Sequence, residues 1–219
     1  MKLIMVTLVP LVALVAGFVS AQELTAIKLL TPSLDGDKPL MQAIKERKSS
    51  REFDTTALSM QDLSNVLWCA NGINRPENGH RTAPSAMNRQ DIDVYAVLVN
   101  GIYLYDATQH QLTPVAAGDF RKEAGMQEFV ATAPLNIVFV SDMAKFETAR
   151  QPEDKIWMAG LDAGHCSQNV YLYCASDNLA VVTRMSLDKT KMGELMKLRP
   201  EQQIVLAETV GYPKPTERK

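Results

Sequence analysis

The chain has few cysteines and histidines, and they do not gather into a site. They stand at Cys69, Cys166 and Cys174 and at His80, His110 and His165. No Cys-x-x-Cys pair is present, and no cluster has the spacing of a zinc site. The sequence therefore indicates no metal and no His-based mechanism, and it disfavours a thiol redox protein.

The cysteines also give little sign of a disulfide framework. Cys166 and Cys174 lie in one helix-like stretch, where eight residues span about 12 Å, which is too far for a direct bridge. Cys69 belongs to an apolar run and is expected in the core. One disulfide that involves Cys69 stays open as an alternative.

Charge of one sign is not in excess, and only one long hydrophobic run is present. The formal net charge is -2 and the pI is about 5.9, which gives no support to nucleic-acid binding. A hydrophobic share of 46% in 219 residues is ordinary for one domain with a real core. No internal repeat or domain linker is visible.

The hydrophobic run lies at the N-terminus. Lys2 precedes an apolar stretch over 3–18, and Val19-Ser20-Ala21 has the small residues of a cleavage site. Residues 1–21 are predicted to be a secretory signal peptide, with 22–219 as the mature domain in the periplasm or outside the cell. An uncleaved anchor is the alternative, but the run is short and contains Pro10.

The mature chain mixes helical and strand-like periodicity. Helices are predicted over 38–47, 58–70 with Ser59 as N-cap, 118–130, 154–176 and 187–198, and strands over 93–99, 102–105, 111–115, 135–140, 179–183 and 203–210. Loops are expected over 22–37 and 75–83. Asn100-Gly101 between two strands indicates a hairpin, so the class is α+β rather than an all-parallel sheet.

A short basic turn, residues 46–53, is the first candidate site. Arg47, Ser49 and Arg51 alternate, so in an extended stretch their side chains point to one side. Two guanidinium groups and a hydroxyl suit a phosphate or an anionic ring edge. A solvated basic loop is the alternative.

A second candidate is the segment 83–90. Pro84, Ser85 and Ala86 allow the backbone to approach a flat ligand, and Asn88 and Gln90 add hydrogen-bonding groups. A helix N-terminus capped by Ser85 is compatible with this role. Small residues at helical spacing over 160–167 favour close helix packing, either in the core or at a subunit interface.

Taken in order, these motifs resemble the nitroreductase family of FMN-dependent oxidoreductases. The motifs are Arg47-x-Ser49-x-Arg51, Pro84-Ser85-Ala86-x-Asn88-x-Gln90, the Gly-rich stretch 160–172 and terminal Gly211-Tyr212-Pro213-Lys214. The pattern is most similar to the branch that includes the SagB-type azoline dehydrogenases. The resemblance covers about 40–214 and implies a mainly antiparallel sheet surrounded by helices in an intertwined homodimer.

The resemblance also implies which residues bind FMN. Arg47 and Ser49 would face the phosphate or ribityl chain, and Arg51 would lie near N1, where the reduced flavin gathers negative charge. Further contacts are implied for Pro84, Ser85, Ala86 and Asn88 from the other subunit, for the backbone of Thr183, Arg184 and Met185 beside N5 and O4, for Gln127 at the ring, and for Lys214, with Arg218, at the phosphate.

Two departures bear on the reaction. The flavin-edge turn often has an acidic residue followed by Gly in this family, whereas here it is Thr183-Arg184-Met185. The predicted export also removes the chain from cytoplasmic NAD(P)H. The expected function is an exported FMN oxidoreductase that passes hydride through flavin N5 to or from a small aromatic or heterocyclic substrate. The alternative is an exported flavin- or ligand-binding protein without turnover.

Overall fold

The computed structural model describes residues 23–146 and 151–215, so the predicted signal peptide (1–21) and Arg218 lie outside the described residues. Its α-helices are α1 (Leu40–Glu46), α2 (Met60–Asn71), α3 (Pro152–Ser176) and α4 (Lys189–Leu195). Its strands are β1 (Ile27–Lys28), β2 (Ile73–Arg75), β3 (His80–Arg81), β4 (Ile92–Leu98), β5 (Gly101–Asp106), β6 (Gln111–Ala117), β7 (Leu135–Asp142), β8 (Ala180–Arg184) and β9 (Gln202–Gly211).

Seven strands form one sheet in the order β1-β6-β5-β4-β7-β9-β8. Each neighbouring pair is antiparallel. This confirms the predicted α+β class with a central antiparallel sheet. The β4–β5 hairpin is present, but Leu98 pairs with Gly101, so its two-residue loop is Val99-Asn100, one residue earlier than predicted.

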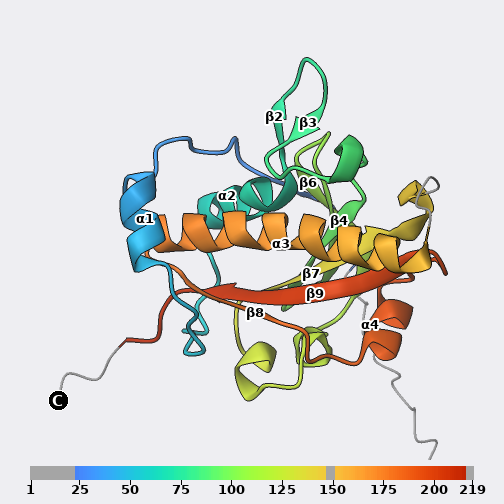
Figure 1. The fold of residues 1–219 in the computed structure, drawn as a ribbon. Helices are drawn as coiled ribbons and strands as arrows, with labels where there is room; N and C mark the ends of the chain where they lie inside the picture. Colours follow the sequence, from blue (N-terminus) through green and yellow to red (C-terminus); the bar gives the residue numbers. More distant parts are fainter. Residues whose placement is uncertain (1–22, 147–150, 216–219) are drawn as a thin grey trace, which may run out of the picture.

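Helices α2 and α3 cover one face of the sheet, and α1 packs against the C-terminal end of α3 (Figure 1). The main core lies between them, where Val66 and Leu67 of α2 and Val170 of α3 are fully buried. The other face packs under α4 and two 3-10 turns, around Val138, Met192 and Met196. The sheet is therefore buried on both faces, as its apolar strand runs require.

The ends of α2 follow local signals in the sequence. The Ser59 side chain accepts a hydrogen bond from Asp62 N, which satisfies one of the free amides of the first turn. Gly72 ends the helix, and its own amide donates to Trp68 O. A Cβ on Gly72 would lie 2.3 Å from Trp68 Cδ1, so this position has no room for a side chain.

Three secondary-structure predictions are wrong. The segment 22–37 is not all loop, because it contains β1 (Ile27–Lys28), which pairs with β6. Residues 118–130 form two 3-10 turns, Arg121–Ala124 and Glu128–Ala131, instead of one helix. Gly125 separates them with extended backbone, and a Cβ there would lie 2.3 Å from Arg184 Nη1. Residues 75–83 are not a plain loop, because β2 and β3 form a short hairpin that stands out from the body (Figure 1).

The described part of the chain contains all three cysteines, whereas the membrane-anchor alternative concerns residues 3–18, which lie outside the described residues. Cys69, Cys166 and Cys174 are all free thiols. Burial raises the pKa of the Cys69 thiol to about 12, so this group stays a neutral thiol at physiological pH. No helix within 23–146 and 151–215 is long and apolar enough to cross a membrane.

Candidate active site

The basic turn is extended and lies against both β8 and the C-terminal segment. Ser50 N donates to Val181 O at 2.9 Å, as an extra edge strand would. Phe53 forms a β-bridge with Pro213, and Lys214 N donates to Glu52 O at 3.3 Å. Two motifs more than 150 residues apart in sequence are therefore neighbours.

Tyr171 of α3 joins the basic turn to the end of β8. Its hydroxyl oxygen lies 2.8 Å from Ser49 Oγ and accepts a hydrogen bond from Thr183 N at 2.9 Å. The Arg47 guanidinium lies over its ring, 5.2 Å from the centroid, which is a cation–π contact. Ser49, Arg47 and Thr183 are three of the predicted site residues, and one side chain brings them together.

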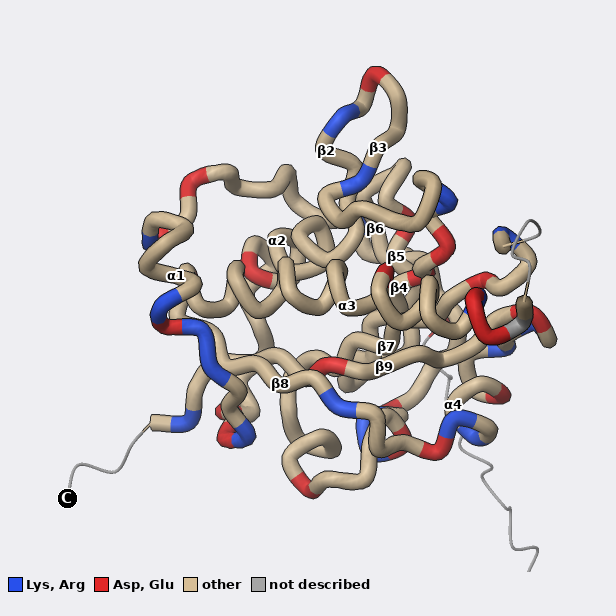
Figure 2. Tube along the Cα trace, in the orientation of Figure 1, with Lys and Arg blue, Asp and Glu red and all other residues tan. Residues whose placement is uncertain are grey.

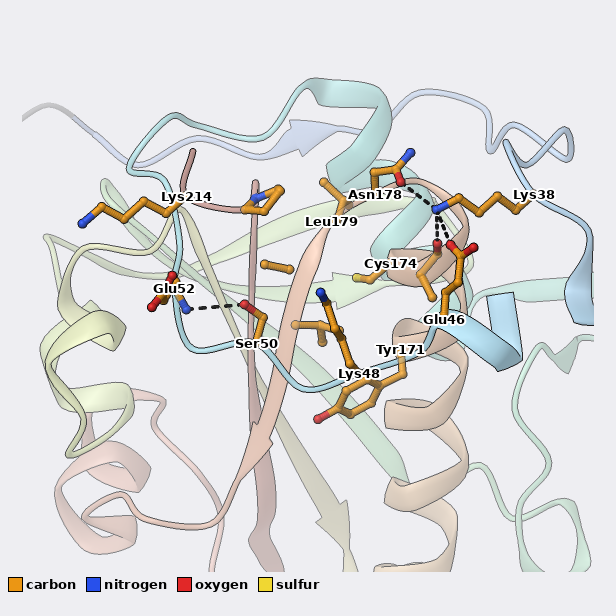
Figure 3. A pocket seen from close by; sticks show the side chains of 14 residues that line it. Lys38, Glu46, Lys48, Ser50, Glu52, Tyr171, Cys174, Asn178, Leu179 and Lys214 are labelled. Atoms are coloured by element: carbon orange, nitrogen blue, oxygen red, sulfur yellow. Dashed lines mark hydrogen bonds and ion pairs between the residues drawn. The ribbon is translucent and has the colours of Figure 1, made fainter. Parts of the chain in front are cut away.

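The basic turn and α3 enclose a polar cavity of about 510 Å³ (Figure 3). The turn contributes Lys48 and Ser50, and the C-terminal segment contributes Lys214. Lys38 also lies there, but its Nζ forms an ion pair with Glu46 at 3.0 Å. Lys48 and Lys214 are thus the cations of this cavity for which no ion pair is seen within the described chain.

Arg51 lies beside a second, more open cavity of about 530 Å³, together with Phe53, Phe129 and Lys214. The side chains of the turn therefore serve two cavities that share Glu52 and Lys214. Figure 2 shows that Lys and Arg gather along the turn that follows α1, and Lys214 lies beside this turn in both cavities, so the region is rich in cations. A phosphate would find donors on either side of the turn.

The end of β8 contains a buried polar cluster. Thr183 Oγ1 lies 2.6 Å from Ser167 Oγ, and both hydroxyls donate to Glu208 Oε1 at 3.1 Å. Glu208 is fully buried on β9, and burial raises its pKa to about 8 despite those two hydrogen bonds. A neutral carboxylic acid therefore lies directly behind Thr183 at neutral pH.

The residues after Thr183 diverge. The Arg184 side chain is buried on the opposite face of β8, where it donates to Asn136 Oδ1 at 2.8 Å and to Ala124 O. Burial lowers its pKa to about 10, so it remains a cation. Met185 is exposed, and Gln127 Nε2 donates to the neighbouring Ser186 Oγ. Gln127 thus lies beside the predicted flavin-edge turn.

The segment 84–90 is held at another place on α3. Both carboxylate oxygens of Asp162 accept from Ala86 N, at 2.9 and 3.1 Å. Pro84 and Asn88 are exposed. The expectation that Ser85 caps a helix is wrong, because its hydroxyl accepts from Gln90 N and only the 3-10 turn Ala86–Asn88 follows.

Within one chain, this segment does not meet the basic turn. Asp162 and Tyr171 are nine residues apart on α3, which corresponds to about 13.5 Å along the axis and roughly half a turn around it. Each segment therefore contacts its own flank of the helix. The structure brings together Arg47, Ser49, Thr183 and Lys214, places Gln127 beside Ser186, and leaves Pro84, Ser85, Ala86 and Asn88 apart.

Sequence reasoning missed Tyr171, Lys48, Ser50 and Glu208. Lys48 and Ser50 belong to the basic turn. In an extended segment they face the side opposite to Arg47, Ser49 and Arg51, so a cavity on that side would have identified them. Tyr171 and Glu208 gave no signal, because one lies within a long helix and the other in a strand-like run.

The family model described as "Nitroreductase family" matches residues 44–212. The chain belongs to the nitroreductase family. A nitroreductase-type protein of Ralstonia eutropha JMP134 has 38% sequence identity and a TM-score of 0.81, covering 87% of this chain and 90% of that one. The nitroreductase-type protein MJ1384 of Methanocaldococcus jannaschii is 25% identical over 171 residues, 73% of this chain and 85% of the relative.

A more distant match shows the fold alone. A chain of the Escherichia coli microcin synthetase McbBCD complex is 17% identical, with a TM-score of 0.68, covering 78% of this nitroreductase-family chain and 70% of that chain. Nitroreductase-family proteins typically bind FMN. The residues present fit this group: Lys48 and Lys214 line the cavity and suit its phosphate, and the Ser50 hydroxyl suits its ribityl chain. Arg47 and Ser49 do not line the cavity themselves but contact Tyr171, which does, and they offer a further cation and hydroxyl beside it.

Proposed function

We propose that this nitroreductase-family chain is an exported, homodimeric, FMN-dependent oxidoreductase for a small aromatic or heterocyclic substrate. The observation that supports this most is the Tyr171 contact, which joins the basic turn and the end of β8 beside a cationic cavity. When bound, FMN accepts a hydride at N5 from a donor and passes it to an acceptor. The chain itself binds and orients the cofactor and supplies cations that stabilise its negative charge.

The cations in and beside the turn would bind different parts of FMN. Lys48 and Lys214 line the cavity and Arg47 lies over Tyr171 at its wall, so these three would hold the phosphate. Arg51, beside Phe53 and Phe129, would face the ring and stabilise the negative charge that reduction adds. Thr183 and Met185 would present their backbone to the flavin edge, with Gln127 beside them.

A homodimer would complete this site, because within one chain the segment 84–90 contacts α3 at Asp162, away from Tyr171 and the basic turn. We infer that Pro84, Ser85, Ala86 and Asn88 act on the flavin of the partner subunit. The outer face of α3 carries Trp157 and Leu161, which are 74% and 61% exposed. Gly160 and Gly164 have no other atoms within 4 Å of a built Cβ, so nothing in the described chain requires glycine there. A second helix that packs closely on α3 would require glycine at these two positions.

Within the family, the motif pattern favours the branch that contains the SagB-type dehydrogenases. The similarity to a microcin synthetase chain agrees in fold. Export, proposed from residues 1–21, would separate the enzyme from cytoplasmic NAD(P)H, so the flavin would oxidise its substrate or receive electrons from another donor. The alternative is a flavin-binding protein without turnover.

The test starts with absorbance. Residues 22–219 are incubated with FMN, desalted and scanned. Retained flavin bands are expected, followed by reduction with NADH, NADPH or a non-nicotinamide donor under anaerobic conditions. A colourless protein would overturn the proposal. A yellow protein that no donor reduces and no acceptor reoxidises would favour the binding-protein alternative.

A further inference from the structure

Two buried carboxyl groups face one another beneath the segment 84–90. Asp91 is fully buried at the start of β4, and Asp162 on α3 is 3% exposed. The Asp162 carboxyl is close enough to raise the pKa of Asp91, and a hydrogen bond between two carboxyls requires a proton on one of them. Neither residue is among those predicted to bind FMN.

One oxygen of the pair has no hydrogen-bond donor within the described chain. Ser141 Oγ donates to Asp91 Oδ2 at 2.5 Å. Asp91 Oδ1 is buried and accepts no hydrogen bond from a donor in the described chain. An unpaired buried carboxylate oxygen is costly, whereas a proton held between Asp91 and Asp162 pairs it.

Asp162 also holds the loop that follows Pro84. Both of its oxygens accept from Ala86 N, so Asp162 anchors the loop to α3. The loop needs an anchor because Met87, Asn88 and Gln90 all have φ values of 51–52°. Side chains other than Gly and Asn seldom adopt this left-handed conformation, and it persists only where surrounding contacts enforce it.

We propose that Asp91 and Asp162 hold one proton between them and thereby fix the 85–90 loop in the shape that meets the partner's flavin. This inference rests on the proposed function for its effect on FMN, although the effect on the loop stands alone. When the pair loses its proton to solvent, two carboxylates repel one another in a buried site. Asp162 then withdraws from Ala86 N and the loop relaxes.

The direction of the pH dependence follows from the surroundings. Burial, followed by Asp162, raises the pKa of Asp91 to about 7, and Ser141 opposes this. No Lys or Arg side chain is among the groups that most affect the pKa of Asp91. The charged or titratable groups on the packed elements have other contacts: Asp142 with Arg199, Lys145 with Gln90 O, Arg89 with Lys145 O, Lys155 with Met143 O, and Cys166 as a buried neutral thiol.

The test compares wild type with Asp91→Asn between pH 6.5 and 8.5. An Asn amide can donate to the Asp162 carboxylate at every pH, so the variant needs no shared proton. For wild type we expect the Kd for FMN to rise at least fivefold across this range, and for Asp91→Asn to change less than twofold. Asp93→Asn, two residues along β4, is the control and should follow wild type. Asp162→Asn is the second variant if Asp91→Asn folds poorly.

A second readout does not involve FMN. Amide hydrogen exchange of Ala86 is measured in flavin-free protein, and the ratio of wild type to Asp91→Asn cancels the intrinsic pH dependence of exchange. This ratio should rise at least fivefold between pH 6.5 and 8.5. A ratio that stays constant would overturn the inference even if FMN binds. Absence of FMN binding at every pH, with a rising ratio, would instead overturn the proposed function alone.

Discussion

The hydroxyl oxygen of Tyr171 lies 2.8 Å from Ser49 Oγ, and the same oxygen accepts the backbone amide of Thr183. Ser49 and Thr183 are 134 positions apart in the chain, and each was predicted to contact FMN from its own motif. One phenol on α3 therefore fixes the distance between the basic turn and the end of β8. A flavin that used both would find them already in place, which reduces the cost of ordering them on binding.

Tyr171→Phe should weaken FMN binding without unfolding the protein. The ring and its contact with Arg47 remain, but Ser49 loses its partner and Thr183 N loses its acceptor. A hydrogen bond contributes about 0.5–1.5 kcal/mol, so the two bonds together contribute about 1–3 kcal/mol, and we expect the Kd for FMN to rise about 5- to 150-fold. Fluorescence titration of FMN measures this.

Tyr173→Phe is the matched control for that variant. Tyr173 stands two residues along the same helix, and its hydroxyl bonds Asn65 and Asp62 of α2 instead of the basic turn. The control should lose stability of similar size and keep its FMN affinity. Equal loss of affinity in both variants would show that the substitutions act by destabilising α3 in general and not through the Tyr171 hydrogen bonds.

Arg47→Ala combined with Arg51→Ala should give a folded protein that purifies without flavin. The substitutions remove the cation over Tyr171 and the cation of the second cavity, while Phe53 and the backbone bonds of the turn remain. FMN content is measured from absorbance, and folding from circular dichroism. Lys122→Ala with Lys189→Ala removes two exposed cations that line neither cavity and should retain FMN. Normal FMN occupancy in the double arginine variant would contradict the site assignment.

The features that the sequence could predict are those set by residues close together in the chain. Ser59 capping, the β4–β5 hairpin and the long α3 were predicted from residues close in sequence, and the structure confirms them. The helix predicted over 118–130 was wrong because Gly125 must make room for Arg184, a contact from a distant strand. Tyr171 and the Asp91–Asp162 pair lay out of reach for the same reason, since their partners come from other elements.

Glu208→Gln should alter how stability depends on pH. The folded pKa of Glu208 is raised to about 8, above the ordinary value of 4.5, so between these two pH values the folded state binds a proton that the unfolded state releases. Wild-type stability contributed by this group is therefore present at low pH and is lost as pH rises towards 8. Gln does not titrate, and it keeps an oxygen for Ser167 and Thr183.

The expected difference can be measured by urea unfolding of flavin-free protein. From pH 5.5 to pH 8, the free energy of unfolding of Glu208→Gln should rise relative to wild type by at least about 1 kcal/mol, since each pH unit of linkage is worth up to about 1.4 kcal/mol. Glu201→Gln, an exposed neighbour before β9, should leave the two curves parallel. Parallel curves for Glu208→Gln would mean that Glu208 is ionised in the folded state throughout.

Gly164→Leu separates a subunit interface from an exposed helix face. In one chain nothing lies within 4 Å of a built Cβ at Gly164, and Leu is a better helix former than Gly, so the isolated chain should become slightly more stable. If a second subunit packs closely on Trp157, Leu161 and Gly164, the new side chain has no room. We then expect a shift from dimer to monomer in sedimentation velocity and loss of FMN, because the segment 84–90 no longer reaches the cofactor.

Gly193→Ala on α4, where the built Cβ meets only Leu198 at 3.7 Å, should leave both properties unchanged. A Gly164→Leu protein that stays dimeric and yellow would place the subunit contact elsewhere on the surface.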